Sequence, residues 1–226
     1  MKAQGASICL SLMLVLAILS AQDCWAEAPS PIVIPLHGGD YVDAFTDFDA
    51  GDTVTFHMTE DRNSAYPMSW IAKDAPYGFL VLDRNLNGLI DNLREMFGNL
   101  TPQPRAPSQS GEPQYPKLPG HQGYTPTGFG ALAYFDRPDK GGNGDGVITK
   151  ADSIWPQLRV WQDTCHCGVS SSGKMYTLDQ LGITEIGTTF VEENRHDRFG
   201  NQLRLKGYLK QGNAQVSIYD VFFRTK

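Results

Sequence analysis

The sequence predicts an α+β fold that is rich in β-strands, with short strands, short helices and an antiparallel meander at the C-terminal end. Three observations support this prediction. Short apolar segments recur between Gly, Asp and Asn turns, as strands do. Two loops rich in Asp, Asn and Gly stand beside segments with the apolar spacing of a helix. The last third of the chain alternates apolar and polar residues between tight turns.

The N-terminus has the features of a secretory signal peptide, residues 1–26. Lys2 precedes an apolar run of 12 residues, Ile8 to Leu19, and small residues lead to a cleavage position after Ala26. A run of this length is too short to cross a bilayer, which takes about 20 residues. No other segment is long and apolar enough to do so. We therefore expect a secreted protein, extracellular or periplasmic, with no membrane span after signal cleavage.

The charge and the cysteines limit the classes of partner and scaffold. The net charge is −6, which disfavours nucleic acid and anionic lipid, because phosphate binding needs clustered Lys and Arg. An acidic surface suits cations. Cys9 and Cys24 would leave with the signal peptide, so Cys165 and Cys167 would remain. Two cysteines are too few for a scaffold built on disulfides.

The first region after the signal peptide, residues 27–100, reads as β-rich. Strands are predicted in the segments PIVIPL, TVTFHM, PMSWIA and GFLVL. Residues 101–127 hold seven of the 14 prolines, a composition typical of a linker or an extended surface loop.

Residues 128–226 are expected to contain two helices and then the meander. The apolar spacing of GFGALAYFD and KADSIWPQLRVW predicts helices, although Pro156 limits or kinks the second one. Three strands are predicted in ITEIGTTFVEE, QLRLKGYLK and AQVSIYDVFFRT, joined by Gly/Asn turns.

A first candidate calcium loop, residues 83–95, follows the predicted strand GFLVL. EF-hand loops take ligands from positions 1, 3, 5, 7 (a backbone carbonyl), 9 and 12, with Gly at position 6. Position 12 is Arg94, so Glu95, four residues after Asp91 on one face of a predicted helix from about Asp91 to Phe97, is expected to close the site. The alternative is an Asn/Gly turn with a helix cap. The predicted ligands are Asp83, Asn85, Asn87, Leu89 through its carbonyl, Asp91 and Glu95.

A second candidate loop lies in FDRPDKGGNGDGVITKADS, residues 135–153. When Gly146 is placed at position 6, position 1 falls on Gly141, which offers no side chain. Asp136 or Asp139, carried on a longer entry segment, would then supply the missing ligand. The alternative is a Gly-rich turn capped by Asp145. The predicted ligands are Asp136, Asn143, Asp145, Val147 through its carbonyl, Thr149 and Asp152.

A third stretch, WQDTCHCGVSSSGKM, has the outline of a calcium loop without its chemistry. Asp163 and Gly168 take positions 1 and 6, but Cys165 and Cys167 take positions 3 and 5. Thiols are soft ligands and calcium prefers oxygen, so no calcium site is expected here. We expect a disulfide between Cys165 and Cys167 in an oxidising compartment. A soft-metal site with His166 is the alternative, for which the sequence shows no fourth ligand.

Together these stretches resemble a family of uncharacterised secreted bacterial calcium-binding proteins with EF-hand-like, dockerin-like loops. The matching text is FLVLDRNLNGLIDNLREMFGNLTPQP, GGNGDGVITKAD, LRVWQDTCHCGVS, YTLDQLGI and DRFGN. The resemblance implies calcium ligands at the positions of the first two loops and brings no catalytic activity. Where such proteins carry a DLDGDG-like turn this chain has PLHGGD, so that site is expected to be lost. The altered turn DFDAGDT leaves open whether Asp47 and Asp49 form a site.

These observations favour a secreted protein in which calcium stabilises a module that binds an extracellular protein or glycan. A second hypothesis is a calcium-stabilised secreted hydrolase acting on glycans or peptides, in which Trp70, Trp155 and Trp161 would line a sugar site; the same tryptophans are otherwise core residues. A dockerin-like docking module is less favoured, because dockerins pair neighbouring loops. Buried tryptophans would favour the binding module over the enzyme.

Overall fold

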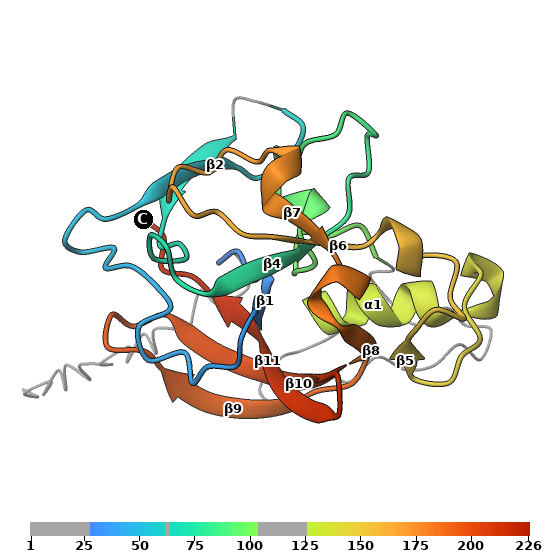
Figure 1. Cartoon of the computed structure of the whole chain (residues 1–226). Coiled ribbons are helices and arrows are strands. Elements are labelled where there is room, and N and C mark those ends of the chain that lie inside the picture. The colour runs from blue at the N-terminus through green and yellow to red at the C-terminus, as the bar shows by residue number, and fades with distance from the viewer. Residues whose placement is uncertain (1–27, 62–63, 104–125) are drawn as a thin grey trace, which may run out of the picture.

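The computed structural model describes residues 28–61, 64–103 and 126–226, so the predicted signal peptide and nearly all of the Pro-rich segment lie outside the described residues. Figure 1 shows the chain with its elements labelled. The strands and the α-helix are β1 Ile32–Pro35, β2 Val54–His57, β3 Ala65–Met68, β4 Tyr77–Val81, α1 Gly128–Asp136, β5 Val147–Ile148, β6 Arg159–Trp161, β7 Met175–Thr177, β8 Ile183–Gly187, β9 Val191–His196, β10 Gln202–Gln211 and β11 Ala214–Phe222. The 3₁₀ helices are Leu93–Glu95, Pro138–Lys140, Trp155–Gln157, Ser172–Lys174 and Asp179–Leu181.

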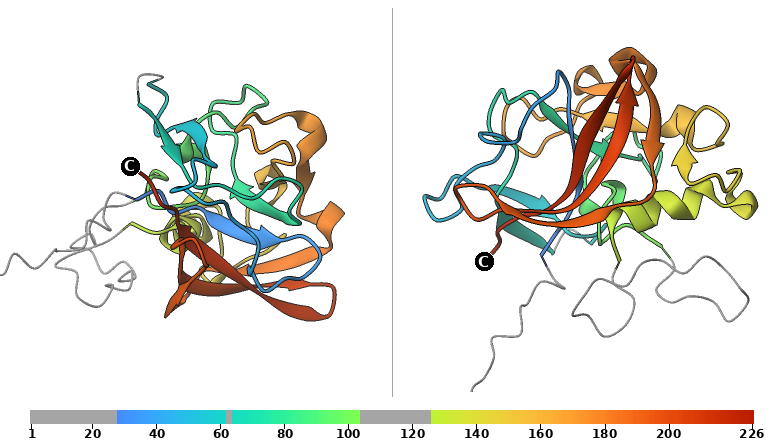
Figure 2. Two further views of the ribbon diagram at one scale, coloured as in Figure 1. Left: turned by 90° about the vertical axis from the view of Figure 1, so that its left-hand side faces the viewer. Right: turned by 90° about the horizontal axis from the view of Figure 1, so that it is seen from below.

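Most strands belong to one antiparallel sheet in the order β5-β8-β10-β11-β1-β4-β6-β7, and β9 also pairs with β10. Strands β2 and β3 form a separate hairpin. The sheet curls, with the long β10–β11 pair bending around one side of the molecule (Figure 2). The regions on both sides of the Pro-rich segment therefore contribute strands to the same sheet.

The predicted α+β class is wrong, because the described residues form a β-rich fold with a single α-helix. The helix predicted in GFGALAYFD forms as α1, but it precedes the second loop, whereas the predicted fold class placed the short helices after the loops. No α-helix follows the first loop, where only the 3₁₀ turn Leu93–Glu95 forms. The segment KADSIWPQLRVW also forms no α-helix, since it divides into the 3₁₀ turn Trp155–Gln157 and strand β6.

Backbone pairing explains why no α-helix follows the first loop. The N–H of Leu82 donates to the carbonyl of Glu95 (2.8 Å), and the N–H of Phe97 donates to the carbonyl of Leu80 (2.9 Å). The chain after the loop therefore returns alongside β4 in extended form. These tertiary hydrogen bonds outweigh the weak helical preference of a seven-residue segment, which is too short to be a stable helix alone.

At the C-terminal end the structure has one more strand than predicted. The segment ITEIGTTFVEE divides into β8 and β9, and both pair with the same edge of β10. Strand β9 pairs near the start of β10, and β8 pairs near its end. Strand β11 pairs with the whole of β10, with a register shift between Leu203 and Leu205.

Two apolar cores lie on the two faces of the sheet, and β1 shows how one strand serves both. Ile32 and Ile34 belong to the core that includes α1, whereas Val33 between them belongs to the core under the β2–β3 hairpin. All three side chains are fully buried. Successive side chains of a strand point to opposite faces, so a strand buried on both faces reads as a continuous apolar run.

Candidate metal centres

The first loop begins where β4 ends, and Asp83 organises its turn. The backbone N–H of Gly88 donates to Asp83 Oδ2 (2.8 Å), and that of Asn87 donates to Asp83 Oδ1 (3.2 Å). Asn87 also donates this N–H to Asn85 Oδ1 (3.0 Å). Gly88 has a φ of 82°, in the left-handed region that glycine enters at no steric cost. The structure thus gathers the predicted side chains at positions 1, 3 and 5 around one turn.

Glu95, at the far end of the first loop, accepts hydrogen bonds from two residues of the loop. Its Oε2 accepts the N–H of Asp91 (3.0 Å), and its Oε1 accepts the N–H of Arg84 (3.1 Å). Asp91 Oδ2 in turn accepts the side-chain amide of Asn87 (3.0 Å). Burial raises the pKa of Glu95, and the N–H donors of Asp91 and Arg84 partly offset this rise. Asn92, which the sequence analysis missed, donates to both Asp91 and Glu95.

The buried hydroxyl of Ser170, in the third loop, binds the backbone of the first loop. Ile90, at position 8, is buried, and its N–H donates to Ser170 Oγ (2.6 Å). Leu89, whose carbonyl was predicted as a ligand, has an exposed side chain. A pocket of about 560 Å³ opens between the first loop, β2 and the third loop, and Leu89 and Val169 line it. No sequence signal pointed to Ser170, because the two residues are 80 positions apart.

In the second loop, Asp136 takes the place that Asp83 has in the first. Asp136 is the last residue of α1, and its Oδ2 accepts the N–H of Gly146 (2.8 Å) while its Oδ1 accepts that of Gly144 (3.0 Å). Asp139 instead forms an ion pair with Arg137 (2.8 Å), and the Arg137 hydrogen bond lowers the pKa of Asp139. Of the two aspartates named from the sequence, Asp136 is therefore the one whose carboxylate folds back onto the Gly-rich turn.

The far end of the second loop contains a buried carboxylate with one oxygen left without a hydrogen-bond partner. Asp152 is 1% exposed, and its Oδ2 accepts the N–H of Thr149 (2.7 Å). Its Oδ1 is buried and has no partner in the structure. Between the two ends, Asn143 Oδ1 accepts the N–H of Asp145 (3.1 Å), and Asp145 Oδ1 accepts the N–H of Val147 (3.1 Å). A buried carboxylate oxygen without a partner is costly, and a cation bound in this loop would supply one.

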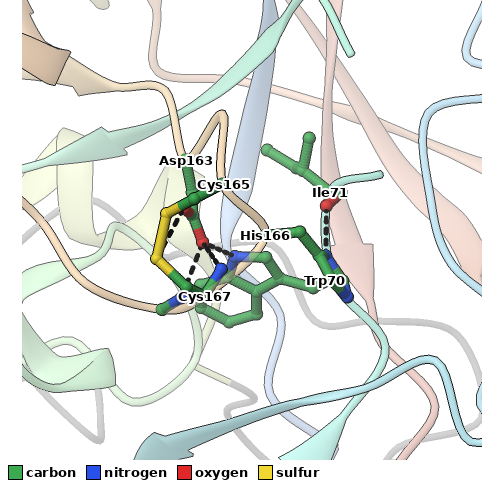
Figure 3. Close-up of a disulfide and its surroundings, with 7 residues drawn as sticks. Trp70, Ile71, Asp163, Cys165, His166 and Cys167 are labelled. Atoms are coloured by element: carbon green, nitrogen blue, oxygen red, sulfur yellow. Dashed lines mark hydrogen bonds between the residues drawn. A yellow bond between two sulfur atoms is a disulfide. The ribbon is translucent and has the colours of Figure 1, made fainter. Parts of the chain in front are cut away.

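The third loop repeats the same Asp–Gly contact around a disulfide (Figure 3). Asp163 Oδ2 accepts the N–H of Gly168 (2.7 Å), that of Cys167 (3.0 Å) and the indole Nε1–H of Trp70 (2.9 Å). The expected disulfide joins Cys165 and Cys167, whose Cα atoms are 5.2 Å apart. His166 Nδ1 lies 2.8 Å from the carbonyl oxygen of Ile71, away from the two sulfurs. Trp70 was not predicted to contact this loop.

In the turn around Asp47 and Asp49, both carboxylates already have partners within the protein. Asp47 Oδ1 accepts the N–H groups of Asp49 (2.9 Å) and Ala50 (3.3 Å). The carboxylate of Asp49 pairs with Arg224 at 2.7 Å. Because this arginine already balances the charge of Asp49, we do not include the turn among the candidate metal centres.

These loops combine carboxylates, amides and turn carbonyls, which are the ligands of a hard cation such as Ca²⁺. Throughout the described part of the chain, three His, Cys, Asp or Glu ligand atoms come within 4.8 Å of one another only at Asp163, Cys165 and Cys167. In the first and second loops, asparagine amides and backbone carbonyls would therefore have to complete a coordination shell.

The three tryptophans proposed for a sugar site are buried. Trp70 and Trp161 have no exposed surface, and Trp155 is 6% exposed. Trp70 packs against Phe56, Phe79 and Trp161 in tilted and edge-on contacts, in the core beneath the β2–β3 hairpin. They are core residues and do not line an open site.

Comparisons with known proteins identify relatives of this chain. A model of the SPM domain matches residues 42–224. The iron-regulated protein FrpA of Neisseria meningitidis serogroup C is 33% identical over 153 residues. The match covers 67% of this chain and 12% of that protein, so the chain corresponds to a small part of its relative. In the part of the chain that the structure describes, no helix is long and apolar enough to span a membrane.

Proposed function

The chain belongs to the SPM domain family, and we propose that it is a secreted calcium-binding module in which calcium stabilises the fold. The observation that carries this proposal is the buried Asp152, whose Oδ1 has no hydrogen-bond partner in the loop where an EF-hand-type site would place its closing carboxylate. An unpaired buried carboxylate oxygen costs free energy that a bound cation would recover.

The residues present fit this role in two loops. Asp83, Asn85, Asn87, Asp91 and Glu95, with the carbonyl of Leu89, would hold one ion. Asp136, Asn143, Asp145, Thr149 and Asp152, with the carbonyl of Val147, would hold a second. Calcium supplies positive charge that offsets the repulsion between clustered carboxylates. Bound to the folded state alone, it would stabilise that state by mass action.

The second half of the proposed function is binding to an extracellular protein or glycan. Exposed apolar side chains on the loops support it. Leu86 is 84% exposed on the first loop, and Val169 is 67% exposed on the third. Leu89 and Val169 border the pocket between these loops. Apolar side chains exposed at a pocket are a common feature of binding surfaces.

Calcium removal tests the proposal directly. If each site had a dissociation constant near 10⁻⁵ M, about 1 mM calcium would add roughly 2.7 kcal/mol per site. Two sites would then contribute about 5 kcal/mol, against roughly 5–15 kcal/mol for a whole domain. We expect a chelator to lower the melting temperature sharply and metal analysis to find two calcium ions per chain. An unchanged melting curve in a metal-free preparation would refute the proposal.

A further inference from the structure

The third loop keeps the backbone of a cation loop but replaces two of its ligand positions with sulfur. We propose that reduction of the Cys165–Cys167 disulfide by a dithiol converts this loop into a site for a soft or borderline divalent cation such as Zn²⁺. Cys165, Cys167 and the buried carboxylate of Asp163 would be its protein ligands. In the oxidised protein the disulfide lies where the loop would otherwise hold an ion.

The two oxygens of Asp163 have different surroundings. Oδ2 accepts three N–H groups, from Trp70, Cys167 and Gly168. Oδ1 faces the sulfurs, 3.1 Å from Cys165 Sγ and 3.7 Å from Cys167 Sγ. Because disulfide sulfurs carry no proton, these are contacts and not hydrogen bonds. Oδ1 is therefore left with a lone pair directed at the two atoms that reduction would turn into thiolates.

The spacing of the three atoms suits one small cation. A tetrahedral Zn²⁺ with bonds of about 2.3 Å to sulfur and 2.0 Å to oxygen keeps its ligand atoms roughly 3.5–3.8 Å apart. The two O···S distances, 3.1 and 3.7 Å, are already close to this range. The sulfurs, joined at 2.02 Å, must separate. Both cysteines are exposed, so a dithiol can reach them and water can occupy the fourth coordination position.

Neighbouring residues fix the carboxylate of Asp163 in place and hold His166 away from the proposed metal site. Asp163 is 2% exposed, and Trp70, which binds its Oδ2, is fully buried. His166 lies between the two cysteines in the sequence, but its Nδ1 is 2.8 Å from the Ile71 carbonyl and its Nε2 is 2.9 Å from Asp52 Oδ1. Figure 3 shows its ring turned toward Ile71 while the disulfide covers Asp163.

The redox step is thiol–disulfide exchange. A thiolate of the dithiol attacks one sulfur and forms a mixed disulfide, and its second thiol then displaces the cysteine. The dithiol leaves as its own disulfide after giving two electrons, and Cys165 and Cys167 become thiols. Zn²⁺ then replaces the two thiol protons, which pass to solvent. Calcium does not compete for the sulfurs because it prefers oxygen ligands.

Cobalt titration tests the proposal, because Co²⁺ bound to thiolate gives a near-ultraviolet charge-transfer band. The protein is reduced anaerobically with a dithiol, the dithiol is removed, and Co²⁺ is added with calcium present to fill oxygen sites. We expect the band to saturate at one Co²⁺ per chain and to disappear when Zn²⁺ is added. The oxidised protein has the same sequence and should give no band. A reduced protein without the band would overturn the proposal.

Three variants assign the ligands. Cys165→Ser should abolish the band. Asp163→Asn keeps both thiols and should weaken cobalt binding by more than the roughly 10- to 100-fold that loss of an outer-shell partner costs. Its oxidised form is checked for a cooperative melt. His166→Ala is the matched control and should keep the band, since its ring contacts Ile71. A band that survives in Cys165→Ser, or unchanged affinity in Asp163→Asn, would contradict the assignment.

Discussion

Asp136 accepts a 2.8 Å hydrogen bond from the backbone N–H of Gly146, ten residues along the chain. Asp83 accepts the same bond from Gly88, which is five residues along. The second loop therefore contains extra residues that the structure folds aside in the 3₁₀ turn Pro138–Lys140. Helix α1 carries the carboxylate to the position that a shorter loop would fill from its own first residue.

The first prediction compares Asp136 with its neighbour Asp139. Asp136→Asn should lower the calcium affinity of one site by about tenfold or more, because ligand charge sets the affinity of such loops. Asp139→Asn should leave the affinity unchanged, since Asp139 pairs with Arg137 and Asp136 accepts the N–H groups of the Gly-rich turn. Titration calorimetry of both variants measures this difference. Equal affinities in the two variants would show that Asp136 is not a ligand.

The second prediction concerns the unpaired oxygen of Asp152. In chelator, Asp152→Asn should melt at the same temperature as the natural protein or higher, because it removes a buried charge. Adding calcium should raise the melting temperature of Asp152→Asn by less than it raises that of the natural protein. Thermal denaturation with and without calcium separates the two effects. The exposed Asp179→Asn loses the ion pair with Lys150 and keeps an oxygen that can accept the indole N–H of Trp155. It should keep the full rise in melting temperature that calcium gives. If calcium raised the melting temperature of Asp152→Asn as much as that of the natural protein, Asp152 would not be a ligand.

The third prediction is that the free energy of unfolding depends on pH because of Asp220 on β11. Asp220 is fully buried, and burial raises its pKa to about 7, although the N–H of Gly128 and the hydroxyl of Ser30 partly offset this. The folded state therefore binds this proton more tightly than the unfolded state, where the pKa is about 4. The free energy of unfolding should fall as pH rises from about 4 to 7, by roughly 4 kcal/mol from this group, and then level off.

Urea unfolding of the calcium-free protein across this pH range tests the Asp220 effect. Asp220→Asn keeps an oxygen that can accept the N–H of Gly128 (2.7 Å in the natural protein) and cannot ionise. The difference in unfolding free energy between the variant and the natural protein should grow with pH up to about 7. Two parallel pH profiles would refute the expectation.

The fourth prediction tests the contact between β10 and α1. A Cβ atom at Gly207 would overlap the ring of Phe129, which is fully buried. Gly207→Ala should lower the free energy of unfolding by about 1–3 kcal/mol, as overpacking in a core does. Gly173→Ala meets no atom within 4 Å and should change it by less than about 0.5 kcal/mol. Urea midpoints of both variants measure the difference, and equal midpoints would contradict it.

Strands such as β4 and β10 could be predicted from local patterns, whereas β5, β6 and β7 were missed and the helix predicted after the first loop does not form. The apolar run of β4 and the alternation in β10 are visible in a few consecutive residues. The chain from Asp91 to Phe97 also has a helical pattern, but its backbone pairs with Leu80 and Leu82 across the loop. Such pairing depends on the position of β4 in the sheet, which no single segment reveals. This is why the α+β prediction failed.

In the candidate site, too, contacts between residues close in the sequence could be predicted and contacts between distant residues could not. In the first loop, Asn87 contacts Asp83 and Asp91, and Glu95 contacts Asp91. Each of these pairs is four residues apart, so spacing alone could predict the contact. The contact between Trp70 and Asp163 joins residues 93 positions apart, and its two partners carry no motif in common. Spacing narrowed the entry ligand of the second loop to two aspartates. The choice between them required the end of α1 and the ion pair of Arg137.

Strand β1 lies between β11 and β4, so the first and the last strands that the structure describes are hydrogen-bonded neighbours. The pairing of β1 with β11 therefore cannot form until the polypeptide has been synthesised as far as β11. Pairing of strands so distant in sequence raises the contact order and slows folding.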